Sequence, residues 1–269
     1  MSDMGVLREA KHVMAAHFPG AHVAAMWEMR RRLFPSARQR LEAEIFAKLG
    51  NPSTILDGPF TGMRYHRIVY AGSTLARTLA VYEKEIHSAV ERLISWGPDV
   101  VVDIGTSDGY YLVGLARRLP TIKAVGYDML SLCRYLTRRV IQMNGVQDRV
   151  QVRGKCEPAD LERVLSSGQR PAVFSDCDGG EDHLLRPDIV PSLRRAMILV
   201  ELHDVYIPGI SEEIRRRFEP THTVELIPVR IHQASDVPSR FGLTETEAAA
   251  VDGWQRRMDN FWYLMTPRT

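Results

Sequence analysis

The chain has 269 residues, of which 45% are hydrophobic and 25% charged, and its formal net charge is +2. This length suits one large domain or a domain with an appendage, and the apolar content can fill a core. The near-neutral charge gives no electrostatic reason to expect a nucleic-acid or membrane partner. Charges interrupt the apolar runs well before the roughly 18 residues of a membrane span, and the first residues, MSDMGVLREAKH, lack the apolar core of a secretory signal. We therefore expect a cytoplasmic protein.

Cysteine and arginine usage exclude two further classes of site. The cysteines Cys133, Cys156 and Cys177 form no Cys-x-x-Cys pair and are odd in number, so reduced thiols are expected rather than a disulfide framework or a zinc knuckle. The one basic run, MRRRLFPSARQR, predicts a solvated helix face rather than a phosphate-binding surface. We expect a small-molecule partner and no nucleic acid or membrane, and the composition leaves a homodimer open.

The first third of the chain has the periodicity of amphipathic helices. Apolar residues recur at spacings of three and four from Val6 to about Gly50 and again from Thr74 to Trp96. Residues 51–73 between them are rich in Gly, Pro and Ser, which predicts a loop or lid. Inside this segment, GPFTGMRYHR fits a hinged flap and a static surface loop equally well. We predict that residues 1–97 form a helical cap or lid region.

Beyond Trp96, short β-branched runs alternate with helical segments. The runs are VVVDI, IKAVGYD, RVQVR, PAVFSD and AMILVEL. Continuous Val, Ile and Leu is typical of parallel strands buried on both faces, so the alternation predicts βαβ units in an α/β fold. Two last strands, THTVELIPV and NFWYLMTP, flank a polar stretch in which Thr244 and Glu247 have the spacing of a capping box.

The segment VVDIGTSDGYYLVGLA joins the first predicted strand to a helix predicted over residues 110–118. Asp103 falls at the carboxyl end of the strand, the edge at which open α/β sheets bind ligands, and Gly105 to Gly109 form the turn. A dinucleotide fingerprint would read G-x-G-x-x-G, whereas this turn contains Asp108, which would repel a pyrophosphate. The turn therefore favours a ligand with a positive centre, such as S-adenosylmethionine (SAM). Asp128, at the end of the second strand, is suited to the ribose hydroxyls of such a ligand.

Three segments together resemble a known family. In chain order, DIGTSDGYYLVGLA, NGVQDRVQVRG and FSDCDGGEDHLLRPDIVPSLRRAMILVELHD resemble the class I SAM-dependent methyltransferases, most closely the FkbM-type group. The resemblance covers roughly Tyr82 to Val229. It implies a Rossmann-like, doubly wound, seven-stranded and mostly parallel sheet, with residues 98–269 as the SAM-binding domain and 231–259 as an insertion covering the substrate side. This sequence departs from the family at Ser107, where many members have glycine, and at Asp178 and Gly180, where the FkbM pattern has Glu and Ala.

The resemblance also implies a set of cofactor-binding residues. They are Asp103, Gly105, Thr106, Ser107, Gly109, Tyr110, Asp128, Met129, Glu157 and Asp176. Each acid has a structural alternative: Asp103 could cap the turn, Asp128 the helix beginning near residue 131, and Glu157 could be a solvated residue before Pro158. The alignment of several strand ends at one edge favours the cofactor role. For Cys156, beside the expected adenine position, we expect a structural role.

Acidic residues and a histidine follow the fourth and fifth predicted strands. The candidate bases are Asp176, Asp178, Glu181, Glu201, His203 and Asp204. For Glu181 and Asp182, we expect solvated acids that cap the next helix. Since neighbouring strand ends face each other, Asp176, Asp178, His203 and Asp204 could together hold a divalent metal. Adjacent side chains at a strand end often point apart, which favours a metal-free site with His203 as general base and Asp204 and Asp178 beside it.

These residues predict an enzyme, a SAM-dependent methyltransferase that modifies an O, N or C nucleophile of a small metabolite. The alternatives are a nicotinamide-dependent oxidoreductase, disfavoured by the missing middle glycine and by Asp108, and a noncatalytic SAM-binding protein. A thermal shift with SAM supports the first and last of these functions, and one with NAD supports the oxidoreductase.

Overall fold

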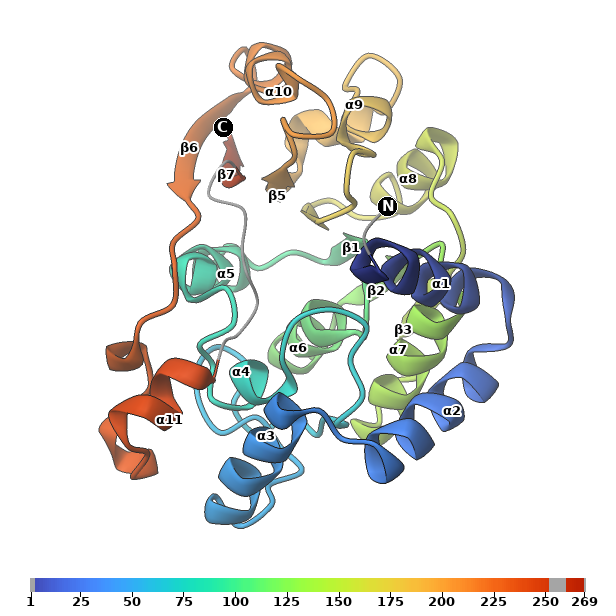
Figure 1. Cartoon of the computed structure of the whole chain (residues 1–269). Helices are drawn as coiled ribbons and strands as arrows, with labels where there is room; N and C mark the ends of the chain where they lie inside the picture. Colours follow the sequence, from blue (N-terminus) through green and yellow to red (C-terminus); the bar gives the residue numbers. More distant parts are fainter. Residues whose placement is uncertain (1–2, 252–259, 269) are drawn as a thin grey trace.

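The computed structural model describes residues 3–251 and 260–268, in which a single sheet lies between helices (Figure 1). Its strands are β1 (Val100–Ile104), β2 (Lys123–Tyr127), β3 (Val150–Arg153), β4 (Pro171–Ser175), β5 (Met197–Leu202), β6 (His222–Pro228) and β7 (Phe261–Pro267). They lie in the order β3-β2-β1-β4-β5-β7-β6, and only the pairings made by β7 are antiparallel. The predicted fold class, an α/β Rossmann-like sheet of seven mostly parallel strands, is confirmed.

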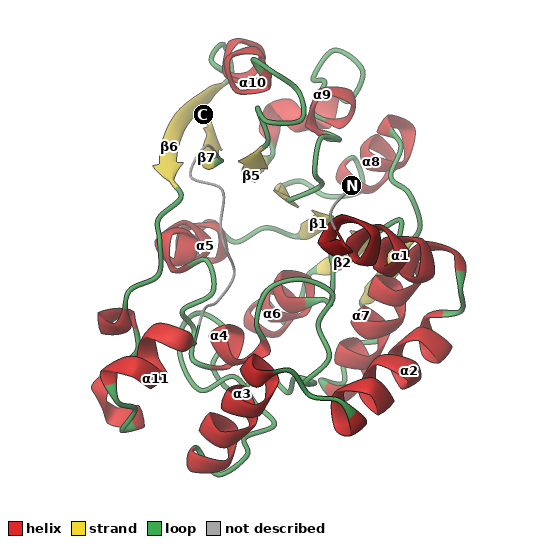
Figure 2. Cartoon of the chain, viewed as in Figure 1, coloured by secondary structure: helices red, strands yellow, loops and turns green. Residues whose placement is uncertain are grey.

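Helices cover both faces of this sheet (Figure 2). The α-helices are α1 (Asp3–His17), α2 (Gly20–Leu33), α3 (Ala37–Lys48), α4 (Thr74–Thr78), α5 (His87–Trp96), α6 (Tyr110–Arg118), α7 (Ser131–Met143), α8 (Pro158–Leu165), α9 (Glu181–Leu184), α10 (Ile210–Phe218) and α11 (Glu245–Ala250). The short 3-10 helices are η1 (Lys84–Ile86), η2 (Pro191–Arg195), η3 (Ala234–Asp236) and η4 (Ser239–Phe241). Helices α5, α6 and α7 share one core with the sheet, and α8, η2, α9 and α10 share another on the opposite face. None of the described helices combines the length and apolar composition that a membrane crossing needs.

The strand order explains where a ligand can lie. Every residue of β1, β4 and β5 is buried, as expected for central strands that are covered on both faces. From β1, the chain first adds β2 and β3 on one side and then β4 and β5 on the other. The crossover connections diverge between β1 and β4, and ligands of such sheets bind outside the strand ends at that point. The side chains that follow β1, β2, β4 and β5 therefore meet at one edge.

The segment from Thr74 to Trp96 corrects one prediction, because it is not one continuous helix. Helix α4 ends at Thr78, and the chain then turns through Ala80 and Glu83, whose φ angles are +55° and +48°. Left-handed φ values in non-glycine residues interrupt a right-handed helix. The apolar spacing continues across this break because Val81 and Ile86 are buried in the turn. Glu83 is consequently buried instead of lying on a solvated helix face.

The segment 51–73 is irregular, as predicted, but its middle is part of the core. The side chains of Phe60 and Met63 are at most 1% exposed. The ring of Phe60 packs edge-on against Tyr111, and a Cβ at Gly114 would lie 2.5 Å from this ring. A hinged flap would have to expose these groups each time it opened, so the structure supports the static alternative.

The N-terminal helices and the insertion contact each other. Helices α1, α2 and α3 account for most of residues 6–50, where the apolar periodicity predicted helices. Helix α11 begins with the predicted capping box, in which Thr244 accepts a hydrogen bond from the Glu247 amide. The insertion packs on Ile45 and Phe46 of α3 in a small separate core. The domain limits of 97 and 231–259 remain predictions, and residues 252–259 lie outside the described residues.

Candidate functional site

The turn between β1 and α6 has the tight backbone that its glycines predict. The φ angles of Gly105, Ser107 and Gly109 are +85°, +51° and +85°, so alternate residues are left-handed. Gly105 is also in close contact with the end of β4, since a Cβ there would lie 1.8 Å from the carbonyl oxygen of Asp176. The turn and the residues following β4 are therefore in direct contact.

Asp128 connects this turn to the end of β2. One of its carboxylate oxygens accepts from the Ser107 amide at 2.9 Å and the other from the Leu130 amide at 2.8 Å. Burial raises the pKa of Asp128 to about 6, although both amides oppose the shift. Each oxygen can accept a second hydrogen bond, so the carboxylate remains able to bind a diol. Met129 follows directly and is 63% exposed.

Three of the other predicted cofactor residues in this region, Asp103, Thr106 and Tyr110, are deeply buried. Burial, together with the nearby charge of Asp128, raises the pKa of Asp103 well above its usual range. The Thr106 hydroxyl lies 3.4 Å from that of Thr137, inside the protein. The side chain of Tyr110 packs edge-on against Tyr65 within the core. Only the backbone of Tyr110 is therefore available to a ligand at this edge of the sheet.

Asp108 has a different environment from the one predicted. Its carboxylate is fully buried, accepts a hydrogen bond from the Tyr65 hydroxyl at 2.5 Å and lies 3.7 Å from the Arg77 guanidinium. The charge of Asp108 is thus balanced inside the protein. The prediction that it selects a cationic ligand is not supported, since a paired carboxylate exerts little net field.

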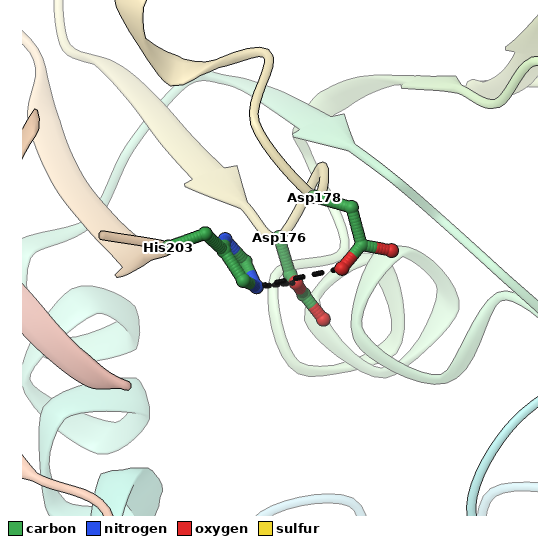
Figure 3. Close-up of side chains that lie close together, drawn as sticks. All are labelled: Asp176, Asp178 and His203. Atoms are coloured by element: carbon green, nitrogen blue, oxygen red, sulfur yellow. Dashed lines mark ion pairs between the residues drawn. The ribbon is translucent and has the colours of Figure 1, made fainter. Parts of the chain in front are cut away.

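His203 is at the centre of a group of carboxylates after β4 and β5 (Figure 3). Its Nδ1 atom lies 2.9 Å from a carboxylate oxygen of Glu181. Its Nε2 atom faces Asp176 at 3.5 Å and Asp178 at 3.6 Å. The Glu181 contact orients the imidazole, so that Nε2 is presented to the two aspartates. The structure therefore brings together three of the four predicted metal ligands.

Asp204 is the predicted member that does not join this group. Its carboxylate accepts hydrogen bonds from the Gly209 amide at 3.0 Å and the Ser211 hydroxyl at 3.1 Å. Both partners belong to the start of α10, so the side chain caps the following loop and helix. Both residues lie beyond β5, which ends at Leu202, and the chain turns at Asp204, so the two side chains separate.

Glu181 corrects the prediction of a solvated capping residue. It is 0% exposed, and its contact with His203 makes it part of the site. Asp182, one residue later, is half exposed and forms an ion pair with Arg217 at 2.5 Å. The two neighbouring acids thus have different roles, because α9 turns one inward and the other outward.

Two glutamates also belong to this site: Glu201, which was predicted as a candidate base, and Glu83, which was not predicted. Glu83, Asp176 and Glu201 each place a carboxylate oxygen within 4.8 Å of the others. The Tyr111 hydroxyl donates to Glu83 at 2.6 Å and so holds it in place. Burial, followed by the charges of Glu83 and Asp178, raises the pKa of Asp176 well above its usual range. The position of Glu201 in a predicted strand indicated that it lies near the site, whereas no local sequence pattern indicated this for Glu83.

Glu157 and Cys156 lie after β3. The Glu157 carboxylate is exposed and forms ion pairs with Lys155 at 2.7 Å and His183 at 3.0 Å. It precedes Pro158 at the start of α8 without capping it through its side chain. Cys156 is buried, and all three cysteines are free thiols. The structure thus places Glu157 in the solvated position that was its structural alternative.

The chain is similar to several solved structures at low sequence identity. No protein-family model matches the chain. A precorrin-6y C5,15-methyltransferase from Geobacter metallireducens GS-15 has a TM-score of 0.46 and 12% identity, over 69% of this chain and 88% of that one. An O-methyltransferase from Bacillus cereus, solved with SAH, has a TM-score of 0.45 and 13% identity, over 92% and 99%. The O-methyltransferase TomG from Streptomyces achromogenes, solved with SAM, has a TM-score of 0.45 and 15% identity, over 91% and 96%. These values are too low to assign a family or an activity.

Proposed function

We propose that this protein is a SAM-dependent methyltransferase of the FkbM-like type that modifies an O, N or C nucleophile of a small metabolite. The observation that carries the proposal is the contact between the turn at Gly105 and the backbone of Asp176. This contact places the β1–α6 turn, which is suited to a cofactor, beside His203, which is held by the Glu181 carboxylate. A noncatalytic SAM-binding protein would have no need for an oriented imidazole at this position.

The residues at the sheet edge suit the parts of SAM. Asp128 can accept from ribose hydroxyls, and the exposed thioether of Met129 offers an apolar surface for an adenine ring. When bound, SAM supplies a methyl group on a cationic sulfur that is already a good leaving group. The protein's task is then to hold the nucleophile in line with that methyl group, which supplies most of the acceleration.

His203 has the geometry of a general base for an acceptor that must lose a proton. With Nδ1–H donated to Glu181, the lone pair of Nε2 faces the site and can take that proton. Glu181 then stabilises the imidazolium that forms, as a buried carboxylate beside a catalytic histidine does. An acceptor without an acidic proton would use only the positioning function of the site.

Asp128→Asn tests the cofactor site. The substitution keeps the shape of the side chain and removes the charge, so SAM affinity should fall by roughly 1–3 kcal/mol, the range for a hydrogen bond to a charged group. Isothermal titration calorimetry measures the change, and Asp148→Asn, at an exposed loop acid, is the matched control. Unchanged affinity in a folded Asp128→Asn protein would remove this carboxylate from the site, and a thermal shift with NAD instead of SAM would favour the oxidoreductase.

A specific observation also favours a second version of this function, in which a divalent ion holds the acceptor. Nε2 of His203 and the oxygens of Asp176 and Asp178 lie 3.5 and 3.6 Å apart. Two ligands about 2.1 Å from one small ion are separated by about 3.0–3.4 Å, so the donor set fits with little movement. Such an ion would lower the pKa of an acceptor hydroxyl and orient it. We favour the metal-free site, since Asp204 points away from the group.

Chelation separates these two versions. For the metal-free site, we expect turnover to continue in the presence of EDTA. We also expect titration with Mn²⁺ to give the same heat for the wild-type protein and for Asp178→Asn. Asp188→Asn, at an exposed acid paired with Arg186, is the control for the change in charge. Turnover abolished by EDTA and restored by a single divalent ion would contradict the metal-free version. Mn²⁺ binding that is lost in Asp178→Asn alone would then locate the ion.

A further inference from the structure

One arginine is enclosed within the N-terminal region of the protein. The side chain of Arg77, in α4, is 2% exposed. Its guanidinium donates to the carbonyl oxygen of Ala71 at 3.0 Å and lies over the ring of Tyr82 at 3.9 Å. A buried cation of this kind requires a compensating anion. That anion is Asp108, at 3.7 Å.

Asp108 is supplied by the turn assigned above to the cofactor. Its neighbours in sequence are Ser107 and Gly109, both left-handed, and the Ser107 amide is the donor to Asp128. The second oxygen of Asp108 accepts from the Tyr65 hydroxyl at 2.5 Å. The side chain of Asp108 thus anchors the turn from inside the protein, while the Ser107 amide beside it bonds to Asp128 at the end of β2.

We propose that Tyr65 and Arg77 are positioning residues that hold the β1–α6 turn in the shape that binds SAM, acting through Asp108. The inference rests on the proposed function. Ser107 occupies a left-handed conformation that is unfavourable for a non-glycine residue, and such conformations persist only where the surroundings over-determine them. The two contacts of Asp108, one on each side of its carboxylate, supply that constraint.

The arrangement also makes the N-terminal region an integral part of the cofactor site. Tyr65 belongs to the segment before α4 and Arg77 to α4 itself, and Tyr65 lies 43 positions before Asp108. Arg77 stacks on Tyr82, whose neighbour Glu83 belongs to the carboxylate group around Asp176. One buried cation therefore lies between the cofactor turn and the segment that contributes a carboxylate to the acceptor side.

The experiment measures SAM affinity and unfolding stability in four variants. They are Tyr65→Phe, Arg77→Met, Asp108→Asn and the double variant Arg77→Met/Asp108→Asn. Arg77→Met leaves the buried Asp108 carboxylate without its cationic partner, so it lowers stability, whereas the double variant removes both charges and regains much of that loss. Leu193→Ala, in a buried position of η2 before β5, is the control for destabilisation away from the turn.

We expect Tyr65→Phe and the double variant to bind SAM about tenfold more weakly or worse, the cost typical of losing a group that supports a binding residue. The Leu193→Ala control should keep wild-type affinity at a temperature where circular dichroism shows it folded. Recovery of both stability and affinity in the double variant, or wild-type affinity in Tyr65→Phe, overturns the positioning role while SAM binding by the wild-type protein upholds the proposed function. A wild-type protein that binds no SAM overturns both.

Discussion

Gly105→Ala is expected to abolish measurable SAM binding and to lower the free energy of unfolding by about 3 kcal/mol or more. A left-handed alanine costs about 1–3 kcal/mol by itself. The new methyl group would also lie 1.8 Å from the Asp176 carbonyl oxygen, and this backbone atom cannot rotate away as a side chain would. Either the turn or the chain after β4 must move, and both belong to the site. Calorimetric titration and chemical denaturation measure the two effects.

Gly97→Ala is the matched control for this experiment. Gly97 has a similar φ of +70°, at the end of α5, but no atom lies within 4 Å of its expected Cβ. It should therefore show the cost of the left-handed alanine without the clash, and SAM affinity should be unchanged. Equal losses of stability in the two variants, with SAM binding retained in both, would show that the contact between the turn and Asp176 is unimportant.

His203→Ala is expected to lower kcat by about 10²–10⁴-fold, the contribution of a general base, while SAM still binds. The effect should be on turnover because the imidazole faces the acceptor side, beside Asp176 and Asp178. His222→Gln is the control, since His222 is equally buried but bonds to the Ala196 carbonyl oxygen at the opposite edge of the sheet. Full activity in His203→Ala would show that the acceptor needs no base and that no ion depends on this ligand.

The pH dependence of kcat gives the same hypothesis a second test. Burial by itself lowers the pKa of His203, but its hydrogen bond to Glu181 and the charges of Glu201 and Asp178 raise it overall. A base works in its neutral form, so activity should increase as the pH rises through a value above about 6.5, the usual histidine pKa. Glu181→Gln keeps a hydrogen-bonding group and removes one charge, and it should move this limb to lower pH. An unshifted pH profile in Glu181→Gln would show that Glu181 does not influence the group whose titration controls kcat.

The sheet and its cofactor edge follow from local sequence patterns. Runs such as VVVDI and AMILVEL predict buried parallel strands because no solvated face is available to polar residues, and both strands are buried as expected. Gly105 and Gly109 predict a tight turn because only glycine adopts left-handed φ angles at little cost. Short-range periodicity and backbone sterics were sufficient for these features. The same patterns placed Asp128, Asp176 and His203 at one edge.

The partners of the charged residues were decided only by the tertiary structure. The sequence predicted that Asp108 faces the ligand from the turn. Its buried partner Arg77 lies 31 positions earlier, too far along the chain for a local pattern to indicate the contact. Glu181 and Asp204 exchanged their expected roles, because the direction of a side chain at a strand or helix end depends on how the following segment packs. Glu83 reaches the site because the chain turns at this residue, whereas the apolar spacing predicted a continuous helix there. From the sequence alone, an ionisable side chain is predicted to be exposed to solvent. Only the fold shows whether a partner offsets the free-energy cost of burying it.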